Sequence, residues 1–548
     1  MSATPSLVRR VAIGLCLVGA VLVTMPLGGS ASGAADGDGV ADPTSAVTLH
    51  GQGRFSDLAV TVSQTEHLIN QVVEVTWSGG HQTFPQVGSF NVNYLQIMQC
   101  WGDAASGPDR TQCEFGGYPT DQRGGTWTNS RQVTYGSTLV DPAETLTPPD
   151  GSNRPAVVPF TAVSGVSTTD TPNQFFDSYS TNEIDFGRTR ADGTGQEFFE
   201  MQTTRESPGL GCGERLAGGH VRDCWLVVVP RDSTEVDGSD GAVQLNSSPL
   251  SASNWAQRIV FPMHFDPVGL ACPVGTSERR LVGQEQVGDA ITRWQPVLCQ
   301  ETGSSFGYSH ISDDLARTQT QAADPWLSFV SEPVDPESVV SGKPLAYAPV
   351  SVSGFGIGFN IDRVPGFRPP PDVVATAGQR ITSIRLDARL VAKLLTQSYR
   401  AATFDDTPIA DNPARLTDDP EFQQLNPGLV DHLDFYGLGT VTVPTGQADA
   451  YRELWQWVGQ DPSARAFLDG QPDPWGMVVN PDYRDMTLDR ADFPKSDLAC
   501  RTFGGVQPDL CPLDAFAYAA DVHDAARAAA RGSTLSRSTY NPLAAGGY

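Results

Sequence analysis

Two hydrophobic patterns divide the sequence. Beginning at Val47, apolar residues alternate with polar or small ones, as at Leu58, Val60 and Val62, and this period of two predicts β-strands with one buried face. From about Phe261, short apolar runs alternate with segments whose apolar residues recur every three or four positions, which predicts strands alternating with helices. The chain is therefore expected to be multidomain, with a β-rich, sandwich-like N-terminal domain followed by an α/β domain that has a largely parallel sheet.

The densest pattern lies in residues 384–428. Asp387 can cap a helix whose apolar residues form one stripe, namely Leu390, Val391, Leu394, Leu395 and Tyr399. Pro420 suits the first turn of a second short helix, which ends before Gly428. The same criteria predict helices at 286–298, 448–458, 461–470 and 513–531, and strands at 279–282, 326–330 and, rich in glycine, 345–361.

The N-terminus has the layout of a secretory signal peptide. Arg9 and Arg10 precede an apolar run over 11–27, and small residues follow it. Cleavage is expected near Ala34, which predicts a secreted, extracytoplasmic or cell-surface protein; a retained membrane anchor is the alternative. The chain then divides into a signal peptide (1–34), a flexible leader (35–46), the β-rich domain with loop insertions (47–260), the α/β domain (261–532) and a tail (533–548).

Charge excludes one class of partner. The 548 residues carry a formal net charge of −27, and no run of Lys and Arg offers a basic footprint. Nucleic acid is therefore not an expected partner, because binding its phosphates requires clustered positive charge. The acidic surface favours solubility, and a polyanionic ligand would need a local basic pocket.

Cysteine usage agrees with an oxidising compartment. Removal of the signal peptide with Cys16 leaves eight cysteines, and an even number is typical of disulfide-bonded secreted proteins. Pairing between sequence neighbours is the simplest arrangement, joining Cys100 with Cys113, Cys212 with Cys224, Cys272 with Cys299, and Cys500 with Cys511. Zinc is the rival interpretation, but no C-x-x-C pair supports it, so no metal is predicted.

Two patterns raise the question of catalysis. Residues 303–307 (GSSFG) match the nucleophile elbow of serine hydrolases, yet the elbow needs a strand before its serine and residues 300–302 do not predict one. His310, Asp313 and Asp314 could supply metal ligands or acid/base groups, but surface polar residues are the preferred interpretation. No cofactor motif is present, and a non-enzymatic protein is expected.

Four segments of the second half form an ordered set of motifs, FVSEP at 329–333, a crossing segment from Pro349 to Asn360, LVAKL at 390–394 and LNPG at 425–428. Their order resembles the phosphate-type class of extracytoplasmic solute-binding proteins, the two-lobed receptors of ABC importers with a type 2 periplasmic-binding-protein-like fold. The resemblance runs from roughly Cys272 to Phe493. It implies an α/β two-lobed binding domain over 261–532.

One branch of these proteins is more similar than the others. It consists of secreted proteins from high-GC Gram-positive bacteria in which a β-rich, cysteine-bearing domain precedes the binding domain. The runs ARAFLDG at 464–470 and DPWGM at 473–477 resemble that branch. The resemblance implies a small solute or anion as ligand and a membrane permease or a cell-wall component as partner.

The resemblance also implies a set of ligand-binding residues, Ser309, Ser331, Glu332, Thr445, Gly446 and Gln447. The stretch 443–449 stands where the family has its Arg- and hydroxyl-rich anion loop, and it contains no Arg. Glu332 alone would repel phosphate, since a carboxylate needs a positive partner there. The anion site is thus expected to be altered or lost.

The C-terminal end departs from the family as well. Residues 533–548 are too few to return to the first lobe and complete it. Either the chain is truncated relative to its relatives, or its first lobe is completed differently.

Three functions follow from these features. The first is a solute-binding protein, similar to the substrate-binding component of a phosphate-type ABC importer. The second is a cell-surface structural or interaction protein that uses a degenerate binding fold. The third is a serine hydrolase acting through Ser305.

Overall fold

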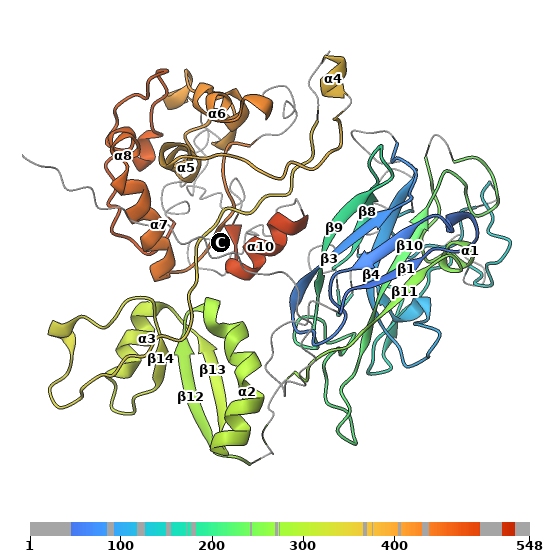
Figure 1. The fold of residues 1–548 in the computed structure, drawn as a ribbon, viewed down its shortest axis with the longest axis horizontal. Coiled ribbons are helices and arrows are strands. Elements are labelled where there is room, and N and C mark those ends of the chain that lie inside the picture. The colour runs from blue at the N-terminus through green and yellow to red at the C-terminus, as the bar shows by residue number, and fades with distance from the viewer. Residues whose placement is uncertain are drawn as a thin grey trace, which may run out of the picture. The chain divides into compact units, whose positions relative to one another are not determined.

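The computed structural model describes residues 45–84, 92–117, 127–136, 138–148, 155–170, 173–176, 182–241, 244–268, 272, 275–364, 370–374, 376–403, 407–429, 438–493 and 518–531 (Figure 1). The predicted signal peptide, most of the predicted leader, the predicted tail, Cys500 and Cys511 lie outside these residues. In the described part the protein is a mixed α/β, multidomain protein with several antiparallel sheets.

The first part consists of two antiparallel sheets. One has the order β1-β2-β3-β9, with bounds Val47–His50, Ala59–Val62, Gln71–Ser78 and Gly195–Met201. The other has the order β11-β10-β4-β5, with bounds Ile259–Met263, Cys224–Arg231, Tyr94–Trp101 and Cys113–Glu114, and β8 (Ile184–Arg188) also pairs with β4. Smaller elements are the β6–β7 hairpin (Phe160–Thr161 and Ser167–Thr168) and α1 (Ala252–Trp255).

One hydrophobic core joins the two sheets, as the predicted sandwich requires. It contains Val60 and Val75 from the first sheet and Ile97, Leu226 and Phe261 from the second. The strict alternation of β2 produces one buried face, because successive side chains of a strand point to opposite sides. Strands β4 and β10 are buried along nearly their whole length, because a second core covers the other face of their sheet.

Three disulfides confirm three of the predicted neighbour pairings. They join Cys100 to Cys113, Cys212 to Cys224, and Cys272 to Cys299. The first links β4 to β5, and the second ties a loop to the start of β10. Such bonds are compatible with a protein of an oxidising compartment.

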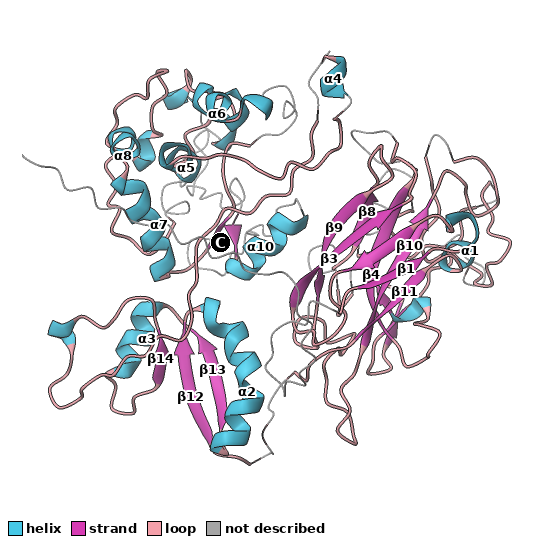
Figure 2. Ribbon diagram, viewed as in Figure 1, coloured by secondary structure: helices cyan, strands magenta, loops and turns pink. Residues whose placement is uncertain are grey.

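The second part begins with a small parallel sheet of order β13-β12-β14, with bounds Ser305–His310, Glu278–Gly283 and Leu327–Phe329. Helix α2 (Gly288–Thr302) packs on β13, and α3 (Asp313–Thr320) packs on β14 (Figure 2). This confirms the prediction of parallel strands connected by helices. We call residues 275–334 the parallel-sheet part.

The described residues between 376 and 493, with 518–531, form the helical part. Its helices are α5 (Ala388–Leu395), α6 (Pro420–Leu425), α7 (Asp449–Gln460), α8 (Pro462–Leu468) and α10 (Val522–Arg531), and α4 (Pro371–Val374) precedes them. A two-stranded parallel sheet pairs β15 (Val443–Pro444) with β16 (Tyr518–Ala519). The core contains Leu390 and Leu394 of α5, Trp455 of α7 and Phe467 of α8.

Short 3-10 helices connect these elements. Their bounds are η1 (Gly53–Phe55), η2 (Arg110–Gln112), η3 (Glu285–Val287), η4 (Pro336–Ser338), η5 (Arg400–Ala402), η6 (Thr407–Ile409), η7 (Leu416–Asp418), η8 (Pro427–Leu429) and η9 (Pro481–Tyr483).

Capping residues explain where several helices begin. The Asp387 carboxylate accepts a hydrogen bond from the Leu390 N–H at 2.9 Å, as predicted for the start of α5. Asp419 accepts from the Glu421 N–H, and Pro420 occupies the first turn of α6. The helix predicted over 513–531 is described only from Val522, since residues 494–517 lie outside the described part.

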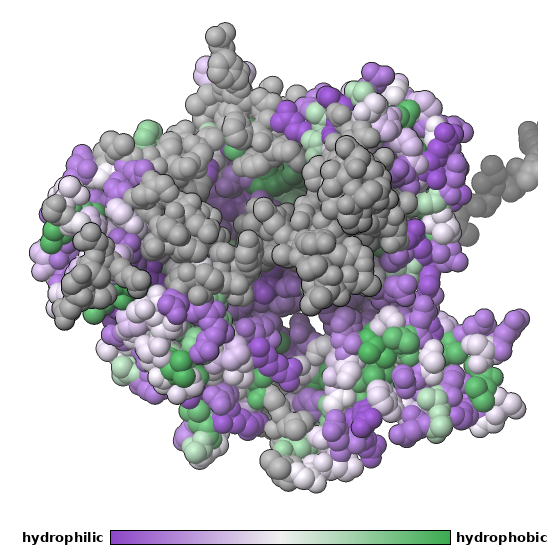
Figure 3. Space-filling view, turned by 180° about the vertical axis from the view of Figure 1, so that it is seen from behind, coloured by the Kyte–Doolittle hydropathy of each residue, from purple (hydrophilic) through white to green (hydrophobic). Residues whose placement is uncertain are grey.

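The predicted strand over residues 345–361 is not formed. Within the described part, no backbone hydrogen bond joins residues 344–360 to another segment, and nearly every side chain from 346 to 359 is exposed. Alternating apolar residues are typical of a strand, but a strand forms only where a neighbour pairs with it. Leu315 of α3 and Leu327 of β14 are exposed too, and Figure 3 shows apolar areas open to solvent over that region.

We expect Asp461→Ala to lower the free energy of unfolding by about 1 kcal/mol at pH 7. The Asp461 carboxylate caps α8 by accepting hydrogen bonds from Ser463 and the Ala464 N–H, and these bonds lower its pKa. A lowered pKa stabilises the fold above the usual carboxyl pKa, and this contribution disappears as the pH falls through the lowered value. Urea unfolding at pH 7 and at low pH measures both effects. Asp469→Ala, which removes only an exposed ion pair with Arg465, is the control with a smaller expected change.

Candidate ligand-binding site

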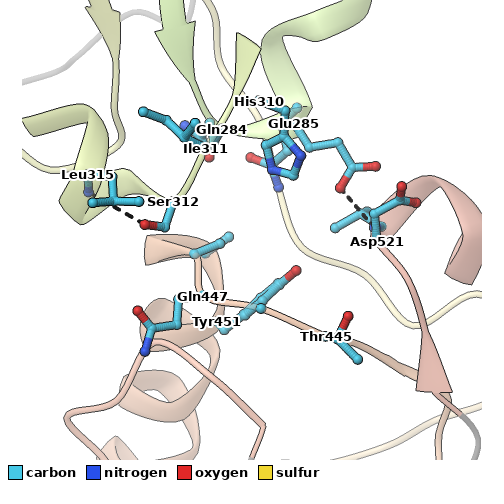
Figure 4. Close-up of a pocket in the computed structure, with 15 residues that line it drawn as sticks. Gln284, Glu285, His310, Ile311, Ser312, Leu315, Thr445, Gln447, Tyr451 and Asp521 are labelled. Atoms are coloured by element: carbon cyan, nitrogen blue, oxygen red, sulfur yellow. Dashed lines mark hydrogen bonds between the residues drawn. The ribbon is translucent and has the colours of Figure 1, made fainter. Parts of the chain in front are cut away.

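Two parallel strands end at one cavity. Residues Gln284–Gln286 follow the carboxyl end of β12, and His310 with Ile311 and Ser312 stands at the carboxyl end of β13. Parallel strands place their carboxyl ends at the same edge of a sheet, where α/β proteins bind ligands. This edge forms one wall of a cavity of about 210 Å³ (Figure 4).

The helical part supplies the opposite wall. Thr445, Gly446 and Gln447 follow β15, and Tyr451 lies in the first turn of α7. Asp521 precedes α10 at the same cavity (Figure 4). Gly446 adopts φ +86°, a left-handed conformation that residues with a side chain rarely take, so the turn into α7 favours glycine here.

Two helices that begin near the cavity are capped by carboxylates from the parallel-sheet part. Glu285 accepts hydrogen bonds from the N–H groups of Val522 and His523, both at 2.8 Å, at the start of α10. Asp313 accepts from the Asp449 N–H at 2.9 Å, at the start of α7. Each carboxylate thus satisfies donors that a helix leaves unpaired at its N-terminus.

Burial raises the pKa of both capping carboxyls. For Glu285, loss of solvent outweighs the hydrogen bonds from Val522 and His523, which act in the opposite direction. For Asp313, loss of solvent outweighs the bond from Asp449. Loss of solvent therefore disfavours the negative charge of both carboxylates, and a positive group nearby would stabilise that charge.

Asp449 connects the two walls through arginine. Its carboxylate accepts from Arg317 of α3 at 2.6 and 2.9 Å, and from Arg452 of its own helix at 3.1 Å. Arg452 also pairs with Glu332 at 3.1 Å. These two arginines, which lie close to the first turn of α7, are thus neutralised by the protein's own acids.

The strand side is further organised by Gln284, which is 8% exposed. Its side-chain amide donates to the Ser331 hydroxyl at 2.8 Å, and its backbone carbonyl accepts from the Tyr308 hydroxyl. The residues after β12 and β14 and the side chain of Tyr308 in β13 are therefore held together near the sheet edge.

No known protein family, curated protein or solved structure matches the chain. Function must therefore be argued from the cavity and its residues. Within the described ranges, no helix is both long and apolar enough to cross a membrane.

The structure brings together half of the ligand-binding residues implied by the family resemblance. Thr445, Gly446 and Gln447 line the cavity. Ser331 lies one hydrogen bond away from it, through Gln284.

The other two implied residues lie elsewhere. The carboxylate of Glu332 is engaged with Arg452. Ser309 is exposed on β13 and is not among the described residues that line the cavity.

Among the cavity residues that sequence reasoning missed are Gln284, Glu285, Tyr451 and Asp521. Tyr451 stood in the apolar stripe of a predicted helix, and its ring does pack in the core beside Phe493. Glu285 directly follows a predicted strand, a position at which a polar residue could have indicated a site.

The residues considered for catalysis lie at different places in the fold. Ser305 begins β13 after helix α2, which is the reverse of the strand-turn-helix order of a nucleophile elbow. His310 lines the cavity, Asp313 caps α7, and Asp314 pairs with Arg317 at 2.5 Å.

A separate acidic cluster lies within the helical core. Among the described residues, Asp419, Glu421 and Asp473 are close enough together to hold a metal ion. The Lys393 ammonium already stands between them, at 2.8, 2.8 and 2.7 Å respectively. Lys393, together with Arg389 on Glu421, therefore provides the positive charge that these three carboxylates require.

Proposed function

We propose that the protein is a secreted, non-enzymatic solute-binding protein whose parallel-sheet and helical parts act as two lobes around the cavity. The observation that carries this proposal is the lining of one cavity by the carboxyl ends of β12 and β13 and by the start of α7. Sites formed between two parts of a chain, at strand ends, are a common place for small ligands. A membrane permease is the partner that such a protein would serve.

Secretion is supported by two independent features. The N-terminal sequence has the layout of a signal peptide. Three disulfides join the predicted neighbouring cysteines. Bonds of this kind persist mainly in oxidising compartments.

The cavity differs from the anion site that the resemblance to phosphate-type receptors implies. Among the described residues that line the cavity, none is Lys or Arg. Arg317 and Arg452 are paired with Asp449 instead. A dianion would therefore meet no unneutralised guanidinium at this wall.

A second function has one observation in its favour. The capping of α10 by Glu285 and of α7 by Asp313 joins the two walls through the protein's own side chains. A binding fold closed in this way could act as a cell-surface interaction module that recognises a cell-wall component. A measurement of solute binding distinguishes the solute-binding function from the interaction module.

The solute-binding function predicts that filling the cavity abolishes binding. Ala448 is a small, half-buried residue of the cavity wall, and Ala448→Leu places three further carbons there. We expect the wild-type melting temperature to rise with at least one solute in a panel of inorganic phosphate, sulfate, glucose, inositol, ethanolamine and 1,4-diaminobutane, since a ligand stabilises the state that binds it.

The matched control is Ala526→Leu, at an exposed position of α10. We expect it to keep the ligand-induced shift that Ala448→Leu loses. A wild-type protein whose melting temperature responds to no solute would contradict solute binding and favour the interaction module.

A further inference from the structure

The charge of the cavity is negative. Glu285 and Asp521 contribute carboxylates, and His310 is the one basic side chain among the described lining residues. Figure 4 shows Glu285, His310 and Asp521 near one another at the end of the cavity opposite Leu315. An anion at this end would be repelled by two carboxylates at short range.

The backbone donors that usually attract anions are already occupied. The first N–H groups of α10, at Val522 and His523, donate to Glu285. The N–H of Asp449 at the start of α7 donates to Asp313. Helix N-termini bind anions through such groups, so the protein's own carboxylates have taken the positions that a ligand anion would need.

The cavity combines two carboxylates with amide and hydroxyl groups and with apolar surface. Carboxylate oxygens of Glu285 and Asp521 lie at one end of the cavity, while Ile311, Leu315 and Val522 supply aliphatic surface. The ring of Tyr451 lies between these ends in Figure 4. This arrangement suits a ligand with a positively charged donor and a short hydrocarbon stem.

A neutral ligand suits the cavity less well. Burial already disfavours the charge of Glu285, and the neighbouring Asp521 adds repulsion. A polyol would donate hydrogen bonds but bring no positive charge to the two carboxylates. An ammonium ion would donate the same bonds and neutralise one of the charges.

We propose that this cavity binds a small organic cation, an aliphatic primary amine in its ammonium form, through Glu285 and Asp521. The proposal rests on the solute-binding function above and specifies the class of the solute. Such a cation site differs from a site that binds anions through helix N-termini.

Isothermal titration calorimetry at pH 7.5 tests the proposal with ethanolamine and 1,4-diaminobutane as ammonium ligands, inorganic phosphate as the anion and inositol as the neutral polyol. We expect saturable binding of at least one amine and of neither other probe. Glu285→Gln and Asp521→Asn should each weaken amine binding by roughly 10- to 100-fold, because each removes a charge-assisted hydrogen bond.

Two features separate loss of binding from loss of structure. Asn can still accept the hydrogen bond that Asp521 receives from the Asp524 N–H at 2.8 Å, so Asp521→Asn preserves the local turn. Glu301→Gln neutralises an exposed acid at the end of α2, outside the cavity, and should leave the affinity unchanged.

The affinity should also depend on pH. Because burial raises the pKa of Glu285, acidification protonates this carboxylate and removes its attraction for the ligand. Asp521, His310, Asp313 and Asp524 are the other acidic or basic groups around it, while burial raises the pKa of Tyr308 and Tyr451, so both phenols stay neutral over this range. Amine binding should therefore weaken from pH 7.5 to pH 5.

The outcomes are distinct. Binding of phosphate or inositol without the amines would overturn the ligand class and leave the solute-binding function intact. Amine binding that neither variant weakens would overturn the assignment to this cavity. Absence of binding by all four probes, together with an unresponsive melting temperature in the wider panel, would overturn the solute-binding function itself.

Discussion

Replacement of Lys393 by Met should lower the free energy of unfolding by about 3–5 kcal/mol, because buried Asp419 and Asp473 lose their cation and Glu421 keeps only Arg389. The Lys393 ammonium is fully buried and bonds Asp419, Glu421 and Asp473. Burial by itself would lower the pKa of Lys393, but these three acids raise it above its usual value, so the lysine is charged at neutral pH. Methionine fills similar space and supplies no charge.

Urea unfolding followed by tryptophan fluorescence measures this effect, since Trp455 is fully buried in the same core. Lys343→Met is the matched control. The Lys343 ammonium donates only to the carbonyls of Gln321 and Ala322, so we expect a loss of about 1 kcal/mol. A Lys393→Met protein that unfolds at the same urea concentration as the wild type would show that the cluster contributes little.

A comparable loss, at least ~3 kcal/mol, is expected for Arg131→Met in the β-rich part. Arg131 is 2% exposed, and its guanidinium donates to five backbone carbonyls. These belong to Arg110, Cys113, Phe115, Val158 and Pro159, at 2.7–3.3 Å. Because Met has no donor, the substitution would leave buried carbonyls unpaired in a region that three segments share.

Two further variants test whether the charge of Arg131 or its hydrogen bonds account for the lost stability. Burial lowers the pKa of Arg131 to about 9, so the group still carries its charge at pH 7. Arg131→Lys keeps the charge but lacks the planar fork, and it should recover only part of the lost stability. Arg205→Met, at an exposed position, should change stability by less than about 0.5 kcal/mol. Full recovery by lysine would show that charge, and not the five hydrogen bonds, is what matters.

Local signals were sufficient to predict much of the fold. The stripe that begins at Leu390 forms α5, and its cap at Asp387 is formed as expected. The short apolar run at 326–330 contains β14. In these cases the information lies within a few residues, since capping and burial of one face depend on neighbours in sequence.

Residues 345–361 show where this reasoning fails. Their alternation predicts a strand, but pairing depends on a neighbouring strand elsewhere in the chain, and in the described part no backbone hydrogen bond joins residues 345–360 to another segment. The cavity could not be predicted from local sequence patterns either. Glu285 and Asp521 are far apart in sequence, and only the fold brings them to the same cavity.

The Lys393 cluster was not predicted for a related reason. Lys393 occupies a polar position within an apolar helix, which by itself indicates a solvent-facing side chain. Asp419 and Asp473 come from two different loops, and no spacing connects them to the lysine.

The exposed segment from 346 to 359 has a consequence for the lifetime of the protein. Proteases bind their substrates as extended chains, and exposed segments without backbone partners are preferred sites of cleavage. Tyr347, Phe355 and Phe359 offer such enzymes large apolar side chains there. A single cut in this segment would divide the covalent chain between the two walls of the cavity. The contacts of Glu285 and Asp313 with α10 and α7 would then be needed to hold the two walls together.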